Sequence, residues 1–191
     1  MLPLDKYKIV LASKSPRRQE LLKAIVPEFS VVLRDTKESY PEGLHEGQIV
    51  EYLAKLKADA FAGELADDQI LITSDTIVWV DGKVLGKPAD REDAIAMLRQ
   101  LSGRRHSVFT GVGITTNARQ RVFSDVTYVH FKQLTDAEIE YYVDNYKPYD
   151  KAGAYGIQEW IGYVGVTKID GSYFNVMGLP VQKLYEELKE F

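Results

Sequence analysis

The sequence predicts a mixed α/β fold, and three observations carry this prediction. Short apolar runs typical of strands alternate with stretches whose apolar residues recur every three or four positions, as they do in helices. Asp-Gly pairs at 81–82 and 170–171 follow apolar runs and favour tight turns of the kind that join antiparallel strands. Strands separated by a helix need a crossover, which produces parallel pairs. We therefore expect a sheet that contains both kinds of pairing.

Local patterns assign the elements of the N-terminal half. Ser15 suits the cap of a helix, and Pro16 suits the first turn that follows. Asp81-Gly82 suits a two-residue turn with positive φ between two strands. The expected elements are a strand at 9–12, a helix at 16–25, a strand at 29–33, a helix at 49–60, a strand at 70–72 and a hairpin at 77–85.

The C-terminal half continues the alternation. Gly103 is expected to end a helix, and Thr135 with Glu138 forms a capping box for another helix. Two long β-branched runs separated by a polar turn are expected to pair. The expected elements are a helix at 94–101, paired strands at 108–116 and 122–131, a helix at 135–146, an apolar stretch at 161–169 and a helix from residue 180.

Composition excludes several classes of protein. The chain of 191 residues is long enough for about one domain and carries a net charge of −4, which argues against broad nucleic-acid binding. It has no cysteine, which excludes a disulfide scaffold, a thiol nucleophile, an iron–sulfur cluster and cysteine-ligated zinc. No apolar run approaches the ~20 residues of a membrane-spanning helix. The expected compartment is a reducing cytoplasm.

The segment Ser13-Lys14-Ser15-Pro16-Arg17-Arg18 places hydroxyl and basic side chains where a strand turns into a helix. A helix N-terminus attracts anions, and arginine adds donors that match phosphate oxygens. The alternative is a capped helix with two solvated arginines. Cations in a first turn oppose the helix dipole, and this cost favours a phosphate site.

Asp75 follows the apolar strand at 70–72. A carboxylate beyond the carboxyl end of a buried strand lies where open α/β sheets bind ligands, and it could hold a divalent cation or accept a proton from water. The alternative is a turn or capping aspartate. Lys87, in Gly86-Lys87-Pro88, and Lys57, on the expected helix at 49–60, could each direct charge at phosphate, although such lysines are more often solvated.

Three other patterns are set aside. Gly111-Val112-Gly113 lacks the third glycine of a dinucleotide fingerprint. The histidines at 45, 106 and 130 match no metal-ligand spacing. The tyrosines at 141, 142, 146 and 149 suit packing better than base stacking.

Taken in order, the motifs resemble those of the Maf family of nucleoside triphosphate pyrophosphatases. The matching segments are LASKSPRRQELL (11–22), SDTIVWVDGKVLGKP (74–88), LSGRRHSVFTGV (101–112), DKAGAYGIQE (150–159) and IDGSYFNVMGLP (169–180). The resemblance implies a single Maf-like domain over 1–191, with a two-lobed, mixed-sheet α/β architecture and a central cleft, as in Maf and ITPase-like proteins.

The resemblance also implies the reaction and its residues. Family members hydrolyse a nucleotide between the α- and β-phosphates with a divalent cation, Mg²⁺ or Mn²⁺. The catalytic aspartate corresponds to Asp75, and the acidic metal-binding position matches Glu38, although Thr36-Lys37 stands where many members have a more acidic pair. The phosphate-binding positions correspond to Ser13, Arg18, Lys57 and Lys87.

Three positions separate the family's dTTP/UTP branch from its 7-methyl-GTP branch. Here they are Arg17, Thr76 and Gln158, a combination that resembles the dTTP/UTP branch. The alternatives are a 7-methyl-GTP pyrophosphatase and a nucleotide-binding regulator of septum formation and cell division that lacks turnover. The expected partner is the nucleotide, without nucleic acid or membrane, and the chain could form a homodimer.

Overall fold

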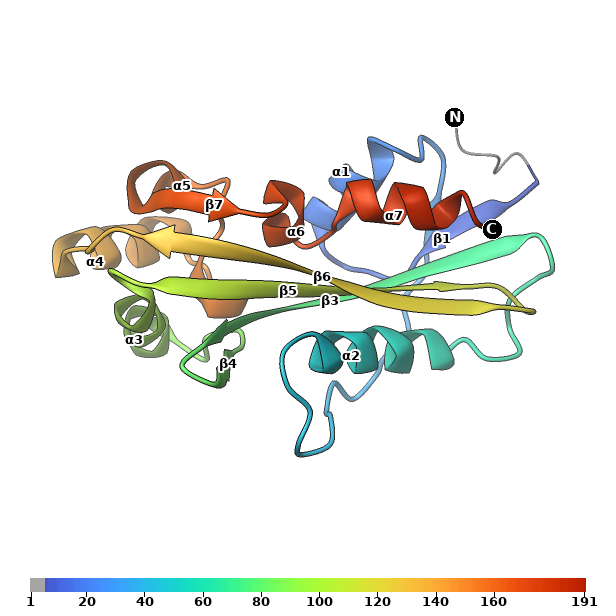
Figure 1. Cartoon of the computed structure of the whole chain (residues 1–191), viewed down its shortest axis with the longest axis horizontal. Coiled ribbons are helices and arrows are strands. Elements are labelled where there is room, and N and C mark those ends of the chain that lie inside the picture. The colour runs from blue at the N-terminus through green and yellow to red at the C-terminus, as the bar shows by residue number, and fades with distance from the viewer. Residues whose placement is uncertain (1–5) are drawn as a thin grey trace. The chain divides into compact units, whose positions relative to one another are not determined.

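The computed structural model describes residues 6–191, and it confirms the mixed α/β class (Figure 1). Within these residues the strands form a seven-stranded sheet in the order β2-β1-β3-β5-β6-β7, with β4 paired to β3. β1 is parallel to β2 and β3, whereas the β3–β4 and β6–β7 pairs are antiparallel. None of the helices in this part of the chain is long and apolar enough to cross a membrane.

The bounds of the elements follow. The strands are β1 (Lys8–Leu11), β2 (Ser30–Val31), β3 (Gln69–Val80), β4 (Lys83–Leu85), β5 (Arg105–Thr115), β6 (Gln120–Phe131) and β7 (Val166–Asp170). The helices are α1 (Pro16–Lys23), α2 (Gly47–Asp59), α3 (Arg91–Leu101), α4 (Asp136–Tyr146), the 3₁₀ turn η1 (Ala152–Ala154), α5 (Trp160–Gly165), α6 (Tyr173–Met177) and α7 (Val181–Leu188).

Several turns and caps predicted from local chemistry are confirmed. Ser15 caps α1, with Pro16 in the first turn, and the Thr135–Glu138 capping box opens α4. Asp81 and Gly82 have φ values of 51° and 75°, so both central residues of the β3–β4 turn have the positive φ that its two-residue hairpin requires. Gly103, with φ 69°, follows α3 in the left-handed conformation that glycine adopts without cost.

Two strand predictions were wrong in extent. The strand expected at 29–33 contains only Ser30 and Val31, because it is an exposed edge strand whose side chains gain little burial. The strand expected at 70–72 continues through Asp75 to Val80. Its polar residues are satisfied inside the fold, since Thr73 donates to the Ala54 carbonyl at 2.7 Å. The stretch at 161–169 divides into α5 and β7.

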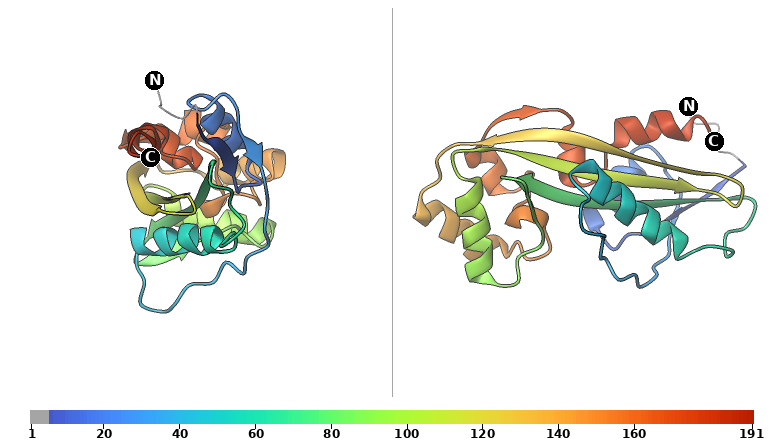
Figure 2. Two further views of the ribbon diagram at one scale, coloured as in Figure 1. Left: turned by 90° about the vertical axis from the view of Figure 1, so that its right-hand side faces the viewer. Right: turned by 60° about the horizontal axis from the view of Figure 1, so that its bottom comes forward.

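The chain folds as two compact units. The first comprises Met1–Asp75, Thr110–Asp125 and Gly178–Phe191, and the second comprises Thr76–Phe109 and Val126–Met177. In the first unit, α2 covers one face of the strands, whereas α1 and α7 lie on the other face (Figures 1 and 2). In the second unit, α3 and α4 pack together, and side chains from both helices join the core with those of β3, β5 and β6.

The two glycines set aside as a dinucleotide fingerprint have a packing role in the first unit. A Cβ atom on Gly111 would lie 2.2 Å from the carbonyl oxygen of Val50 in α2, and one on Gly113 would lie 2.6 Å from the Thr73 hydroxyl. A side chain at position 111 would push α2 outward, and one at position 113 would displace the Thr73 hydroxyl that bonds to α2. The glycines of β5 therefore allow the α2 backbone to lie directly on the sheet. This contact sets the distance between the sheet and the side chains of α2.

A buried histidine lies in the second unit. His106 is 1% exposed, its Nε2 lies 2.6 Å from the Tyr155 hydroxyl, and its ring contacts Phe131 edge-on. Burial lowers the pKa of His106 from 6.5 to about 3, and the charge of His130 acts in the same direction. The imidazole is therefore neutral in the folded protein at neutral and mildly acidic pH.

This burial predicts a pH dependence of stability. Below about pH 6.5 the unfolded chain protonates His106 while the folded chain does not, so the free energy of unfolding falls by roughly 1.4 kcal/mol per pH unit until the folded pKa is reached. Replacing His106→Gln removes this contribution. Urea unfolding at pH 4 to 7 will therefore give a shallower pH slope for His106→Gln than for the wild type. The exposed His45→Gln is the control, and equal slopes for all three proteins contradict the prediction.

Candidate functional site

The candidate site forms where β1 ends beside β3. The last bond of this parallel pairing runs from the Ala12 N–H to the Ile72 carbonyl at 2.9 Å. Carbonyls alternate between the two edges of a strand, so the next one on this edge belongs to Ser74, and β1 no longer reaches it. It accepts hydrogen bonds from the Arg18 guanidinium at 3.0 Å and from the Lys57 ammonium at 3.5 Å. Two cations from different helices thus meet at one backbone oxygen.

Lys57 also links the two candidate acids. Its Nζ lies 2.5 Å from Asp75 Oδ1 and 3.0 Å from Glu38 Oε1. The side chains of Lys57 and Asp75 are 15% and 13% exposed, whereas Glu38 is 50% exposed on the loop before α2. The structure therefore brings together three residues that the sequence supplies from separate segments. Two carboxylates lie within reach of one ammonium, at the surface of the first unit.

Arg18 is held more tightly than a solvated arginine. Its Nε donates to the Gly178 carbonyl at 2.8 Å, in addition to the bond from Nη1 to Ser74. Burial lowers the pKa of Arg18 below its ordinary value, the negative charge of Asp75 acts in the opposite direction, and the neighbouring charge of Arg17 lowers it further. Arg18 thus ties α1 and β3 to Gly178, three residues before α7, with a partly buried positive charge.

Ser13 lies between the end of β1 and the start of α1. It is 6% exposed, and its hydroxyl accepts the Ser15 N–H at 3.2 Å. The Ser15 hydroxyl in turn accepts the Arg18 N–H at 3.4 Å. The hydroxyl-rich segment therefore builds the helix cap that the sequence indicated, and the cap sets the direction of the first turn that carries Arg17 and Arg18.

Alternation along β3 separates two of the candidate residues. Thr73 bonds to α2 and Asp75 bonds to Lys57 of α2, whereas the Ser74 hydroxyl bonds to the Gly178 carbonyl at 3.4 Å. Successive strand residues face opposite sides of a sheet. Thr76 therefore shares the face of Ser74, and Asp75 shares the face of Thr73.

The second unit contains Lys87 and Gln158. The Gly153 N–H donates to the Gly86 carbonyl at 3.0 Å, so the turn that carries Lys87 lies against the segment that leads to Gln158. Lys87 itself is exposed. The Gln158 Oε1 atom is buried and has no hydrogen-bond partner among the residues that the structure describes. A buried acceptor left unpaired costs about 1–3 kcal/mol, which a bound ligand with a suitable donor would recover.

The predicted site residues thus form two groups. Ser13, Arg17, Arg18, Glu38, Lys57 and Asp75 belong to the first unit, and Thr76, Lys87 and Gln158 belong to the second. Sequence analysis missed the Ser74 and Gly178 carbonyls, which organise the first group. No side-chain pattern signals a backbone acceptor. In the structure, the Ser74 carbonyl is available because β1 ends while β3 continues beyond it.

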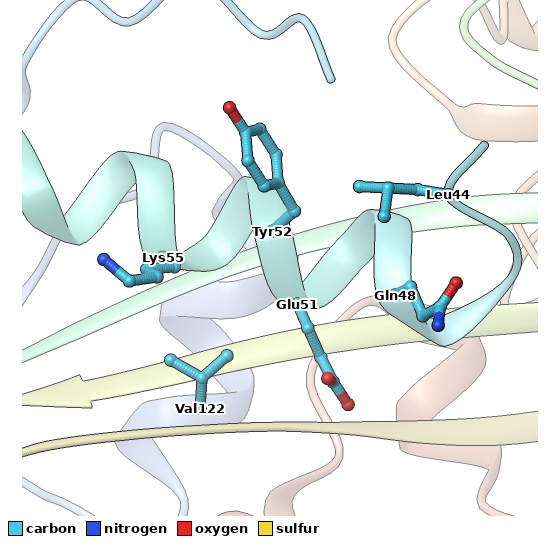
Figure 3. Close-up of a pocket in the computed structure, with 6 residues that line it drawn as sticks. All are labelled: Leu44, Gln48, Glu51, Tyr52, Lys55 and Val122. Carbon is cyan, nitrogen blue, oxygen red and sulfur yellow. The ribbon is translucent and has the colours of Figure 1, made fainter. Parts of the chain in front are cut away.

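A separate hollow lies beside α2 in the first unit (Figure 3). Its volume is about 320 Å³, and it is lined by Leu44, Gln48, Glu51, Tyr52, Lys55 and Val122. Its charged side chains are engaged elsewhere, because Lys55 pairs with Asp59 at 2.6 Å and Glu51 accepts the Ser124 hydroxyl at 2.6 Å. None of the candidate residues lines it, so it is distinct from the cluster around Asp75.

Comparisons with known proteins identify the family of the chain. Proteins named dTTP/UTP pyrophosphatase from Bacteroides thetaiotaomicron and Parabacteroides distasonis are 56% and 57% identical to the chain, covering 98% of it and 97% and 98% of their own lengths. A solved HAM1 protein from Coxiella burnetii matches 97% of this chain and all of its own, with 14% identity and a TM-score of 0.51, which supports the fold alone. The family model described as Maf-like protein matches residues 8–191. The chain belongs to the Maf family.

Proposed function

We propose that this protein hydrolyses dTTP and UTP between the α- and β-phosphates, releasing the nucleoside monophosphate and pyrophosphate. The observation that carries the proposal is the cluster of Asp75, Glu38, Lys57 and Arg18 at the open edge of β3. Relatives that match nearly the whole chain at 56% and 57% identity bear the name of this activity. We further propose that the enzyme acts in the cytoplasm.

The chemistry of the cluster suits a triphosphate. Phosphoryl transfer spreads negative charge over the transferring and leaving groups, so it is favoured by positive charges that are already in place. Arg18 and Lys57 supply two such charges in fixed positions, and Lys87 would add a third. Asp75 would accept a proton from the attacking water or orient it.

The donor set also fits a divalent cation. Asp75 and Glu38 both contact the Lys57 ammonium, so their oxygens lie close together. No group of three or more His, Cys, Asp or Glu residues suited to a metal occurs among residues 6–191. Mg²⁺ typically takes one or two carboxylates together with water and substrate phosphates, and this pair matches that mode. When bound, Mg²⁺ or Mn²⁺ would neutralise phosphate charge and lower the pKa of a coordinated water.

Arg17, Thr76 and Gln158 would select the base. Uracil and thymine present two carbonyl acceptors and an N3–H donor. The unpaired Gln158 Oε1 suits that donor, and an arginine and a hydroxyl suit the carbonyls. A site built on such bonds rejects bases that leave its buried polar atoms unpaired.

Replacing Asp75→Asn keeps the size of the side chain and removes its charge. We expect kcat for dTTP to fall at least ~10²-fold, the usual scale for loss of a general base, with the melting temperature nearly unchanged. Pyrophosphate release measured with Mg²⁺ tests this. Asp81→Asn, in the exposed β3–β4 turn, is the matched control. Near-normal turnover by Asp75→Asn would show that the mechanism is wrong.

Replacing Arg18 or Lys87 with alanine should have similar effects on the kinetics but different effects on the stability of the fold. Both variants should raise KM and lower kcat without changing base preference, because both charges act on phosphate. Only Arg18→Ala should also destabilise the fold, by about 2–4 kcal/mol, because it removes the shortest hydrogen bond to each of the Ser74 and Gly178 carbonyls and the link that they form with α1. Urea unfolding beside steady-state kinetics separates the two effects. Equal stability of both variants contradicts the structural role of Arg18, and a change in base preference without a loss of rate contradicts the phosphate assignment.

The base-selecting trio gives the sharpest test of substrate choice. We expect efficient hydrolysis of dTTP and UTP, weak action on ATP and GTP, and little on 7-methyl-GTP. An Arg17→Trp, Thr76→Gln, Gln158→Glu variant should shift preference toward 7-methyl-GTP, because a carboxylate and an aromatic ring suit a cationic base. A nucleotide panel measures both. Preference of the wild type for 7-methyl-GTP would refute the branch assignment, and no turnover of any nucleotide would refute the enzyme.

A further inference from the structure

The segment that carries Gln158 is held by an unusual set of bonds. The Tyr142 hydroxyl accepts the Gly156 N–H at 2.9 Å and donates to the Glu159 carboxylate. One phenol from α4 therefore binds the first and the last residue of the four-residue segment 156–159. The Glu159 N–H also donates to the Gly156 carbonyl at 3.0 Å, which closes the segment as a turn.

Lys151 completes the set from the other side. Its Nζ lies 3.1 Å from Glu159 Oε1 and 2.8 Å from Asp150 Oδ1, and its side chain is only 10% exposed. Both oxygens of the Glu159 carboxylate are thus engaged, one by Tyr142 and one by Lys151. A Cβ atom on Gly156 would lie 2.9 Å from the Glu159 carboxyl carbon and 3.0 Å from Lys151 Cε, so these side chains pack directly on the glycine.

The energetics favour a rigid segment. Tyr142 is fully buried and its ring stacks on Tyr146 at 5.1 Å, so the phenol has a fixed position. Burial raises the pKa of Tyr142, which keeps the hydroxyl protonated and able to donate. Ala154, just before the segment, has φ 58°, a conformation that costs a non-glycine residue about 1 kcal/mol and that persists only where its surroundings enforce it.

Gln158 lies within the segment that Tyr142, Glu159 and Lys151 hold, a set of residues that we call the bracket. Its own side-chain oxygen takes no part in their hydrogen bonds. Its Oε1 is buried without a partner among the described residues, whereas Gly156 and Glu159 on either side of it are hydrogen-bonded. A carboxamide can discriminate between bases only if its position is fixed before the base arrives, since a mobile side chain would adapt to several bases.

We propose that Tyr142, Glu159 and Lys151 are positioning residues for base selection, which hold the 156–159 segment so that Gln158 presents its oxygen to the pyrimidine. The proposal rests on the proposed function and extends it to residues that do not touch the substrate. Removing the bracket should therefore affect KM and base preference, and leave the phosphate chemistry at Asp75 intact.

The test uses the full-length protein and the variants Tyr142→Phe and Glu159→Gln, with Tyr141→Phe as the control. Tyr141 is the neighbouring residue on α4 and is 49% exposed. We expect Tyr142→Phe to raise KM for dTTP about tenfold, the effect of losing a hydrogen bond to a charged group, and to narrow the preference for dTTP over CTP and GTP by a similar factor. The kcat value should change less than about twofold.

A double-mutant cycle separates positioning from general structural damage. In a Gln158→Ala background, Tyr142→Phe should change base preference no further, because the group that it positions is gone. Hydrogen exchange of the peptide that spans 150–165 should be faster in Tyr142→Phe than in the wild type and unchanged in Tyr141→Phe. If Tyr142→Phe does not fold, Glu159→Gln carries the same comparisons.

The outcomes distinguish this inference from the proposed function. If the wild type is selective and folded Tyr142→Phe keeps the wild-type KM and base preference, the inference alone is overturned. The inference is also overturned if the effects of Tyr142→Phe and Gln158→Ala on base preference are additive. A wild type without turnover on dTTP and UTP overturns the proposed function. In that case hydrogen exchange still tests whether the bracket holds the segment. If the exchange rate of the peptide 150–165 is the same in Tyr142→Phe as in the wild type, the inference is overturned as well.

Discussion

The arrangement of the candidate site depends on one backbone oxygen. β1 stops at Leu11 while β3 continues for eight residues beyond Ile72, so the Ser74 carbonyl has no strand to bond and is shared by Arg18 and Lys57. This sharing brings α1 and α2, which approach from opposite faces of the sheet, to a common point (Figure 2). Asp75 follows Ser74 directly and therefore lies beside cations from both helices. An anionic ligand would meet these charges in positions already fixed by the fold.

The second constraint is the close approach of α2 to the sheet. Gly111 leaves no side chain between β5 and the helix backbone, and Gly113 leaves room for the Thr73 hydroxyl, which bonds to the Ala54 carbonyl. Lys57 lies three residues, or nearly one turn, beyond Ala54 on the same helix. A helix held even one methyl group farther out would lengthen the contact between Lys57 and Asp75. The distance between α2 and the sheet therefore determines both the packing of the first unit and the ion pair between Lys57 and Asp75.

Local chemistry made much of this structure predictable. Ser15 and Pro16 identified α1, Thr135 and Glu138 identified α4, and Asp81-Gly82 identified the β3–β4 turn, because each acts through its own neighbours. Periodicity failed at β3, since Thr73 and Ser74 are satisfied by partners 19 and 104 residues away along the chain. In the Asp75 cluster, local patterns made Arg18, Lys57 and Asp75 candidates, and Glu38 followed from the family resemblance. Their geometry did not, since the Ser74 carbonyl depends on where a different strand ends. The bond from Tyr142 to Glu159 could not be predicted either. The sequence indicated that the tyrosine packs in the core, but it did not indicate the partner of its hydroxyl group.

The alternation of side chains along β3 has a consequence for how such proteins diverge. Asp75 and Thr76 are consecutive, yet the pleat directs them to opposite faces of the strand. A substitution at residue 76 can alter its own face while the contacts of Asp75 with Lys57 stay as they are. Adjacent codons can thus experience independent selection. If residue 76 selects the base as we propose, a point mutation there would change nucleotide preference and leave the Asp75 cluster intact.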